Sequence, residues 1–269
     1  MPELPEVETV RQTLKQFILN ETIENIEVYY SKIIEDDIEI FKEKLIHSTI
    51  RDIDRVGKYL IFLFDDVAFV SHLRMEGKYH IVDKDAPVNK HTHVAFYFKD
   101  KKLLYMDTRK FGRMKLVDRY QYKEELPLSA LGKEPFEIDS YELYVRLHKT
   151  SLPIKTALLD QSIMCGIGNI YANEICFMMG IDPRTRSSRL SKKRVEELKQ
   201  VSIDVLNRAI KAGGTTIHSF DSNGIHGLFQ IQLNAHGQKI CPKCHGEIKK
   251  IMLNQRGTYY CPSCQKKRY

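Results

Sequence analysis

The N-terminus of the chain carries groups that could do covalent chemistry. Removal of Met1 would leave Pro2 as a free secondary amine. An α-amino group has a pKa of about 8, so part of such an amine is unprotonated near neutral pH. A secondary amine that attacks a sugar C1′ forms a cationic iminium, which withdraws electrons from the sugar. Glu3 and Glu6 lie within one turn of Pro2, where their carboxylates could move protons on and off that sugar.

The same residues are also typical of an ordinary helix start. Proline and glutamate are both favoured in the first turn of a helix. The apolar positions that follow have helical spacing and predict a helix over residues 6–19 with one buried face. These positions are Val7, Val10, Leu14, Phe17 and Ile18. Taken alone, the N-terminal residues leave both interpretations open.

Four cysteines near the C-terminus form the most specific pattern in the chain, Cys241-x2-Cys244-x16-Cys261-x2-Cys264. Four thiolates at this spacing predict one tetrahedral Zn²⁺ in a β-hairpin zinc ribbon. Four protein ligands leave no open coordination position, so the zinc is expected to be structural. Disulfides are the alternative, which a cytosolic location disfavours. Arg256 falls in the second half of the expected hairpin, where it would face a phosphate.

A glycine-containing turn precedes a predicted helix over residues 170–179. Gly166 and Gly168 would let the helix N-terminus offer backbone N–H groups to a phosphate, and Asn169 could donate to the same phosphate. Lys155 is a further candidate for a phosphate contact. A turn between packed helices and a solvated lysine are the simpler explanations of these residues.

Two predicted loops at strand ends, residues 72–77 and 107–112, combine apolar and cationic side chains. Met75, Arg109 and Phe111 have the chemistry of side chains that are inserted into a base stack. Core packing is the alternative for Met75 and Phe111.

Three other polar residues lie near predicted strands. Lys58 precedes a strand and is either a functional cation or a strand-end lysine. His91 and His93 have no carboxylate at metal-binding spacing. A phosphate contact or a structural hydrogen bond is therefore expected of the two histidines.

The net charge of +7 is concentrated near the C-terminus. From residue 236 onward, the chain has eight Lys or Arg residues and one acidic residue, Glu247. The net charge of this segment is therefore +7, which equals the net charge of the whole chain. A basic segment on a neutral body indicates a polyanionic partner. No apolar run reaches the length of a membrane span and no signal peptide is recognisable, so a cytoplasmic protein is expected.

The pattern of elements predicts an α+β multidomain chain. Eight short runs rich in β-branched and aromatic residues predict an antiparallel sandwich or barrel, which with its N-terminal helix forms a domain over residues 1–130. After a proline-containing linker the period becomes helical, which predicts an all-α domain over residues 131–220. The zinc ribbon is expected over residues 235–269.

The chain resembles the bacterial formamidopyrimidine-DNA glycosylases, also called 8-oxoguanine DNA glycosylases. The resemblance covers nearly the whole chain and rests on motifs in order: the opening Pro-Glu-Leu-Pro-Glu, Gly57-Lys58-Tyr59-Leu60, His72-Leu73-x-Met75-x-Gly77, Lys90-His91-x-His93, Asp107-x-Arg109-x-Phe111-Gly112, Gly168-Asn169-Ile170-Tyr171, Gly213-Gly214-Thr215-Thr216 and Gln255-Arg256-x-Thr258-x-x-Cys261. Relatives that remove oxidised pyrimidines typically open Pro-Glu-Gly-Pro-Glu, so Leu4 favours the purine-repair branch.

The resemblance implies a monomeric base-excision repair enzyme for duplex DNA. It would remove 8-oxoguanine and formamidopyrimidines and then cleave the abasic strand as a lyase. The implied fold is a β-sandwich, a helix–two-turn–helix domain and a zinc ribbon with one structural zinc. The implied zinc ligands are Cys241, Cys244, Cys261 and Cys264.

The resemblance also implies roles for single residues. The implied catalytic set is Pro2 as Schiff-base nucleophile, Glu3 as the donor that opens the deoxyribose, Glu6 as its assistant, Lys58 as the donor for β-elimination and Arg256 for δ-elimination. The implied DNA contacts are His72, Met75, His91, Arg109, Phe111, Lys155 and Asn169, with Arg109 facing the estranged cytosine. The implied base pocket contains Glu174, Ser219 and Ser222.

One stretch departs from the family pattern. The family commonly has Val-Tyr-Gly-Arg where this chain has Ala235-His236-Gly237-Gln238. A tyrosine contact to phosphate would become a histidine contact or be lost. Two other functions stay open: a glycosylase for oxidised pyrimidines, and a non-catalytic zinc protein that binds DNA lesions, in which Pro2 only starts a helix.

Overall fold

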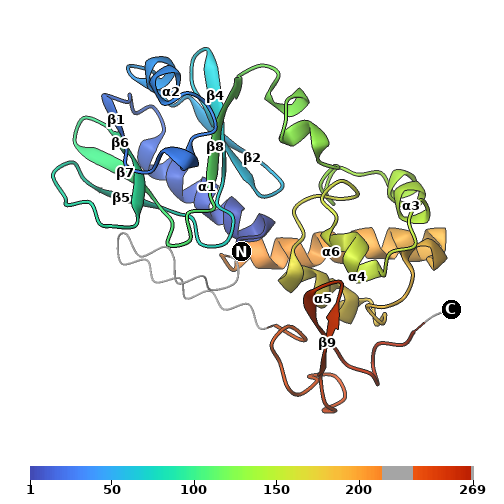
Figure 1. Ribbon diagram of the computed structural model, residues 1–269. Coiled ribbons are helices and arrows are strands. Elements are labelled where there is room, and N and C mark those ends of the chain that lie inside the picture. The colour runs from blue at the N-terminus through green and yellow to red at the C-terminus, as the bar shows by residue number, and fades with distance from the viewer. Residues whose placement is uncertain (214–232, 268–269) are drawn as a thin grey trace. The chain divides into compact units, whose positions relative to one another are not determined.

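The computed structural model describes residues 1–213 and 233–267 (Figure 1). The described chain divides into two compact units, and each is considered by itself. The first contains Met1–Ser129, and the second contains Ala130–Ala212 together with the cysteine module. The helical segment and the cysteine module therefore share one compact unit.

The first unit is a β-sandwich whose described strands form two antiparallel sheets. One sheet has the order β1-β6-β7-β5 and the other the order β2-β3-β4-β8. Each run that the sequence predicts as extended forms a strand, and the predicted sandwich is confirmed. The strands are β1 (Asn25–Val28), β2 (Asp52–Val56), β3 (Tyr59–Leu63), β4 (Val67–His72), β5 (Lys78–Asp83), β6 (Thr92–Tyr97), β7 (Lys101–Met106) and β8 (Arg113–Asp118).

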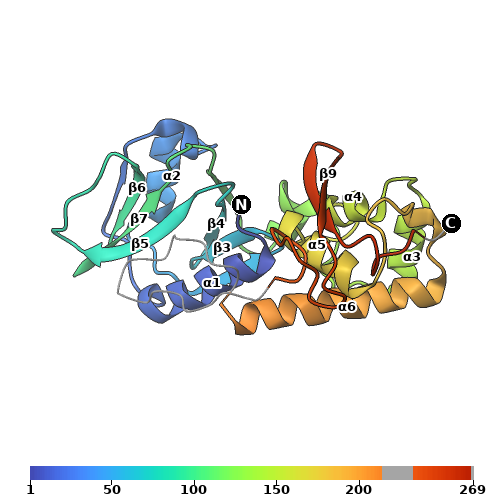
Figure 2. The same ribbon diagram turned by 90° about the horizontal axis from the view of Figure 1, so that it is seen from below.

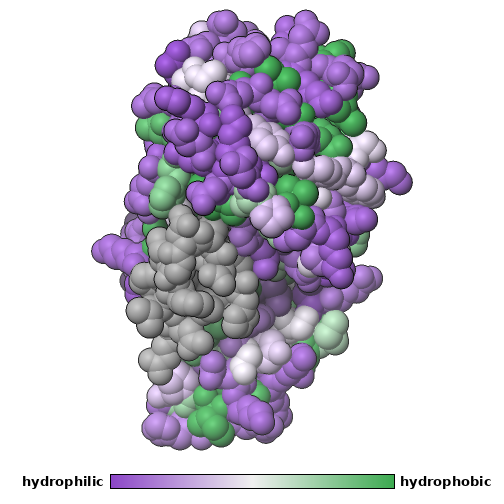
Figure 3. Space-filling model, turned by 90° about the vertical axis from the view of Figure 1, so that its left-hand side faces the viewer, coloured by the Kyte–Doolittle hydropathy of each residue, from purple (hydrophilic) through white to green (hydrophobic). Residues whose placement is uncertain are grey.

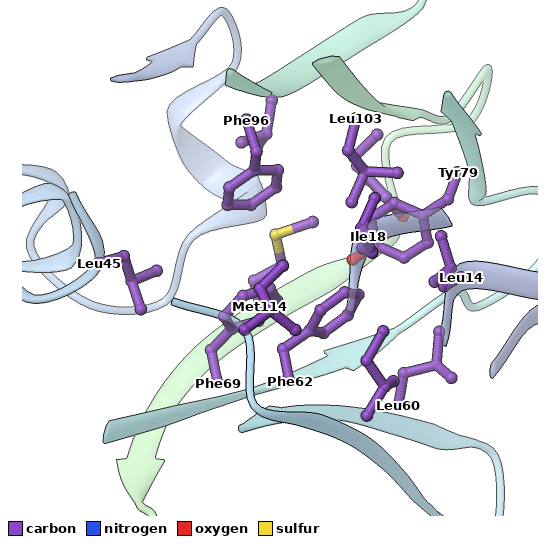
Figure 4. Packing of buried hydrophobic residues seen from close by; sticks show 14 of the residues in the cluster. Leu14, Ile18, Leu45, Leu60, Phe62, Phe69, Tyr79, Phe96, Leu103 and Met114 are labelled. Atoms are coloured by element: carbon purple, nitrogen blue, oxygen red, sulfur yellow. The ribbon is translucent and has the colours of Figure 1, made fainter. Parts of the chain in front are cut away.

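An aromatic core lies between the two sheets (Figure 4). Phe62 on β3 and Phe69 on β4 stack with ring centroids 4.4 Å apart, and Phe69 also stacks on Phe96 of the opposite sheet at 5.6 Å. Leu14 and Ile18 from the N-terminal helix enter the same cluster. Because burial of each large apolar side chain contributes about 2 kcal/mol, this cluster binds the sheets and the helix into one unit.

Helix α1 (Leu4–Ile18) is also tied to β2 through a buried carboxylate. Glu8 accepts hydrogen bonds from Arg11 Nη2 at 2.6 Å and from Arg55 Nε at 2.9 Å. Arg55 Nη1 donates in turn to the carbonyl oxygen of Gly57 at 3.1 Å. Burial by itself raises the pKa of Glu8, but hydrogen bonds from Arg11 and Arg55 outweigh it and lower the pKa to about 2. Glu8 therefore links the helix to the turn between β2 and β3.

One helix of the first unit was not expected from the sequence. Helix α2 (Ile38–Leu45) begins after Asp37, whose carboxylate accepts the backbone N–H groups of Glu39 and Ile40. Its buried positions Phe41 and Leu45 are four residues apart, as one helix face requires. The capping aspartate and this spacing are the signals that could have identified it.

The second unit combines helices with a β-hairpin. Helix α6 packs on α3 and α5 (Figure 2), and Ser191 accepts the Arg194 N–H at 3.4 Å as its predicted N-cap. The hairpin is antiparallel, as the zinc-ribbon pattern predicts. The elements are α3 (Ser140–His148), α4 (Ile154–Leu159), α5 (Asn169–Met178), α6 (Lys192–Lys211), β9 (Lys249–Leu253) and β10 (Arg256–Tyr260).

The surface is polar over the face shown in Figure 3, where apolar residues form only small groups. Among the described helices, none combines the length and the apolar character that a membrane span requires.

The Glu8 network predicts a stability difference that depends on pH. Glu8→Gln should lower the free energy of unfolding at pH 7 by roughly 3 kcal/mol, because removing one partner of a buried ion pair leaves the other charge uncompensated. The folded pKa of Glu8 is lowered, so its stabilisation is full above the unfolded pKa of 4.5 and is lost as pH falls towards 2. Urea unfolding of both proteins between pH 7 and pH 2.5 measures this difference.

Asp65→Asn is the matched control. It breaks an exposed pair in which Arg51 Nε lies 2.7 Å from Asp65, and exposed pairs contribute little to stability. Equal destabilisation by the two substitutions would show that the Glu8 network has no special role.

Candidate active site and nucleic-acid interface

The N-terminal residues that could supply an amine also start helix α1. Glu3 is the N-cap, and its backbone N–H donates to the Glu6 carboxylate at 2.8 Å in a capping box. Pro2 is buried. The helix-start interpretation is correct for Pro5 and Glu6 in the first turn, whereas Pro2 lies just before the N-cap and outside the helix. This interpretation is compatible with the chemical one, because the cap holds Glu3 and Glu6 beside Pro2.

Lys58 and His72 lie at the same end of adjacent strands. Lys58 is 6% exposed and directly precedes Tyr59 at the start of β3. Tyr59 is the register partner of His72 on β4, and their rings meet edge to face at 4.4 Å. Gly57 has a φ of +57°, a left-handed conformation that glycine adopts at little cost. The tight turn at Gly57 thus places Lys58 immediately before strand β3.

His72 is a neutral hydrogen-bond donor. Burial, with the nearby charges of Arg74 and Lys58, lowers the pKa of His72 to about 3. The Arg74 backbone N–H donates to His72 Nδ1 at 2.9 Å, so the neutral ring carries its proton on Nε2. The Nε2–H group suits the phosphate contact predicted for His72 and does not titrate near neutral pH.

The loops after β4 and β7 hold their apolar residues at the surface. Met75 is 37% exposed and Phe111 is 47% exposed, so the core-packing alternative is wrong for both. The Arg109 guanidinium lies over the Phe111 ring, 4.8 Å from its centroid, in a cation–π contact. Exposed apolar side chains beside a cation fit the predicted insertion into a base stack.

Asp107 shapes the second of these loops. Its buried carboxylate accepts the backbone N–H groups of Arg109 at 2.9 Å, Phe111 at 2.8 Å and Gly112 at 2.9 Å. No role was assigned to Asp107 from the sequence, although aspartate at the start of a polar loop is a signal for such backbone bonds.

The two histidines near the start of β6, His91 and His93, differ in burial and in their hydrogen bonds. His93 is buried and its Nε2 lies 2.6 Å from the carbonyl oxygen of Asp107, which is the structural hydrogen bond named as one of its two expected roles. His91 is partly exposed, and its carbonyl oxygen accepts the Asp107 N–H at 3.0 Å. The phosphate contact predicted for the His91 side chain stays a prediction.

In the second unit, Lys155 is buried, whereas the predicted phosphate contact would need it at the surface. It is 1% exposed, and its ammonium donates to Asn169 Oδ1 at 2.7 Å, Gly257 O at 3.0 Å and Thr258 Oγ1 at 2.8 Å. A lysine ammonium has three donors, so these bonds engage all of them and no direct phosphate contact is available in this conformation. Lys155 instead fastens the start of α5 to the zinc hairpin.

Asn169 and Arg256 lie beside this anchor. Asn169 is half-buried at the first position of α5, and its Nδ2 donates to Gly257 O at 3.1 Å. Arg256 is exposed at the start of β10. The structure therefore brings the helix N-terminus and the hairpin arginine into one region of this unit, as a common phosphate-binding surface requires.

The second half of α5 anchors the chain that leads to the cysteines. The Glu174 carboxylate accepts four hydrogen bonds of 2.8–3.0 Å from the backbone N–H groups of residues 234–236 and the Asn234 side chain. Asn173 Nδ2 lies 2.6 Å from His236 Nδ1. Burial lowers the pKa of His236, and Glu174 opposes the shift. This anchoring by Asn173 and Glu174 was missed from the sequence.

The base pocket predicted from the resemblance is described only in part. Ser219 and Ser222 lie outside the described residues. Both oxygens of Glu174 are engaged by the anchor, and its pocket role stays a prediction.

The four predicted zinc ligands come together at one end of the hairpin. Their sulfur atoms all lie within 4.8 Å of one another, with Cys241 Sγ 3.8 Å from Cys264 Sγ and Cys244 Sγ 3.5 Å from Cys261 Sγ. Four Zn–S bonds of about 2.3 Å in a tetrahedron place the sulfurs about 3.8 Å apart. The cluster fits a structural Zn²⁺.

Zinc loss should follow substitution within this cluster. Cys244→Ser should retain much less than one zinc per chain and have a lower melting temperature, because metal binding contributes to folding. Metal analysis of the purified protein measures the loss. Cys176→Ser, which changes a buried thiol outside the cluster, should keep its zinc; equal zinc in the two variants would contradict the assignment.

Three family descriptions match the chain. They are the formamidopyrimidine-DNA glycosylase N-terminal domain over residues 1–114, the formamidopyrimidine-DNA glycosylase H2TH domain over residues 131–221, and the zinc finger found in FPG and IleRS over residues 238–267. The three matches together confirm the predicted fold class.

Individual proteins and solved structures that are similar to this chain belong to the same family. The formamidopyrimidine-DNA glycosylase of Oceanobacillus iheyensis is 46% identical over 93% of this chain and 92% of its own length. That of Bacillus licheniformis is 46% identical over 99% of this chain and 100% of its own. The Lactococcus lactis protein, in a crystal structure with DNA that contains N7-benzyl-Fapy-dG, is 39% identical with a TM-score of 0.93 and covers 99% of this chain and 100% of that one. This chain belongs to the formamidopyrimidine-DNA glycosylase family.

Proposed function

We propose that this chain removes oxidised purines from duplex DNA and then cleaves the strand as an abasic-site lyase. Related structures support the substrate class, since a mutant of the Lactococcus lactis protein was crystallised with Fapy-dG-containing DNA and the Lactococcus lactis protein with DNA that contains an abasic site. The observation on this chain that carries the proposal is the exposure of Met75 and Phe111. Large apolar side chains at two loops of one unit can fill the space that a flipped base leaves.

The reaction begins with the free amine of Pro2. The amine attacks C1′ of the lesion nucleotide, the C1′–base bond breaks with its electron pair going to the base, and the amine nitrogen loses its proton. Glu3, assisted by Glu6, then protonates O4′. The C1′–O4′ bond breaks, the deoxyribose ring opens, and the nitrogen and C1′ become an iminium. The iminium withdraws electrons from the sugar, so loss of a C2′ proton expels the 3′ phosphate in β-elimination. Lys58 donates in this step, and Arg256 donates in the δ-elimination that follows.

The DNA is held through its phosphates and through the gap at the lesion. The DNA backbone is contacted by Asn169, Arg256, His72 and His91. Lys155 donates to Asn169 Oδ1 and so fixes the position of that side chain. Arg109 faces the estranged cytosine while Met75 and Phe111 fill the gap. Glu174, Ser219 and Ser222 belong to the base pocket.

The proposed location is the cytoplasm, with association to chromosomal DNA. It is supported by bacterial relatives and by a basic C-terminal segment that suits a polyanion.

Borohydride trapping tests the reaction. With a duplex that carries 8-oxoguanine opposite cytosine, the wild-type protein should form a covalent complex whose cross-link maps to Pro2. Pro2→Gly should reduce trapping by roughly 100-fold or more, since it replaces the secondary amine. Glu3→Gln should reduce it on the lesion duplex, because ring opening lacks its proton donor.

The duplexes separate the rival functions. Trapping only with an oxidised pyrimidine would assign the other substrate class. Tight binding without trapping on lesion or preformed abasic DNA would leave a non-catalytic lesion-binding protein.

Arg256→Gln should change both the products and the salt dependence of binding. The β-elimination product should accumulate at the expense of the δ product. The slope of log K against log salt should become shallower by about 0.9, because one phosphate contact is lost. Product analysis on a preformed abasic site and titrations at several salt concentrations measure these effects. An unchanged slope would contradict the phosphate contact.

A further inference from the structure

Tyr105 on β7 has an unusual buried hydroxyl. The side chain is fully buried, and the hydroxyl has no hydrogen-bond partner among the described residues. A buried hydroxyl without a partner costs free energy that a phenylalanine would not. Its position therefore calls for a reason other than hydrogen bonding.

The hydroxyl lies against two glycines that belong to the two surface loops. A Cβ atom at Gly77 would lie 2.4 Å from Tyr105 Oη, and one at Gly112 would lie 1.6 Å from it. Both distances are far below any real Cβ contact, so only glycine permits this approach at either position. Tyr105 is thus in contact with the loop that carries Met75 and with the loop that carries Phe111.

Each of the two loops is also closed by hydrogen bonds within the loop. Gly77 N–H donates to Leu73 O at 2.9 Å and closes the first loop. The Asp107 carboxylate closes the second loop through three backbone N–H groups. The Thr108 hydroxyl donates to the Glu76 carboxylate and joins the two loops at the surface. The Tyr105 hydroxyl lies against both loops in addition to this link.

We propose that Tyr105 is a positioning residue whose hydroxyl sets the spacing between the loops that carry Met75, Arg109 and Phe111. The inference rests on the proposed role of these three side chains at the flipped base. If the spacing changes, the side chains meet the base stack in the wrong register, and an error of about 1 Å can cost up to 100-fold in rate. A preformed abasic site has no base to extrude, so its cleavage depends less on this spacing.

Tyr105→Phe tests the proposal, because it removes only the oxygen. We expect the melting temperature to be unchanged or slightly higher, since no protein hydrogen bond of the described chain is lost. The rate of base excision from an 8-oxoguanine duplex should fall by roughly 10-fold. The rate of strand cleavage at a preformed abasic site should stay within about 2-fold. The ratio of these two rates is the readout, and a purely stabilising residue would not change it.

Tyr79→Phe is the matched control. Tyr79 is also fully buried, and its ring lies 5.3 Å from that of Tyr105. Its hydroxyl donates to Ser71 Oγ at 2.7 Å. Loss of that bond should lower stability by a measurable shift in melting temperature and leave the rate ratio unchanged.

The outcomes separate this proposal from the function on which it rests. If wild-type protein excises the base and Tyr105→Phe keeps the wild-type rate ratio, the positioning role is overturned and the glycosylase function stands. If Tyr105→Phe is as destabilised as Tyr79→Phe, the hydroxyl is structural and the proposal fails. If wild-type protein does not excise the base at all, the proposed function itself fails.

Discussion

The hydrogen bonds of the buried Glu8 carboxylate are the interaction on which the N-terminal end of the first unit depends. An isolated charge in a protein interior is costly, and Glu8 is tolerated because Arg11, Arg55 and Gln12 donate to it. Arg55 holds the carbonyl of Gly57 with its other nitrogen. The Glu8–Arg55 ion pair thus connects helix α1, which begins two residues after Pro2, with the turn that precedes Lys58. It holds together two segments that are far apart in sequence.

The second unit uses the same physical solution twice. Lys155 is buried with three acceptors that join α5 to the hairpin, and Glu174 is buried with four donors from residues 234–236. Both charges are fully hydrogen-bonded, which makes them geometric anchors in place of surface contacts. The zinc hairpin is therefore held to α5 by the metal-independent contacts of Lys155 as well as being closed by its four thiolates.

The two surface loops show a different balance between stability and function. Met75 and Phe111 leave apolar area exposed that a core would have buried. Glycines at 77 and 112, the Asp107 carboxylate and the Tyr105 hydroxyl maintain this arrangement. Such local costs are found where a protein must meet a partner, because the partner supplies the missing contacts.

Patterns within the sequence were sufficient to identify the family, the sandwich strands, the zinc ligands and the start of the N-terminal helix. These depend on local periodicity, on residue spacing and on motifs, which neighbours in the chain suffice to define. Helix α2 could also have been recognised, since Asp37 and the spacing of Phe41 and Leu45 are local signals. Which polar side chains are buried, and what they contact, follows from the packing of segments that are far apart in the chain. Lys155 and Asn169 are 14 residues apart, but Lys155 and Thr258 are 103 apart, and no local pattern shows that they meet. Exposure of Phe111, burial of Lys155 and the position of the Tyr105 hydroxyl all follow from long-range packing, which single residue types do not encode.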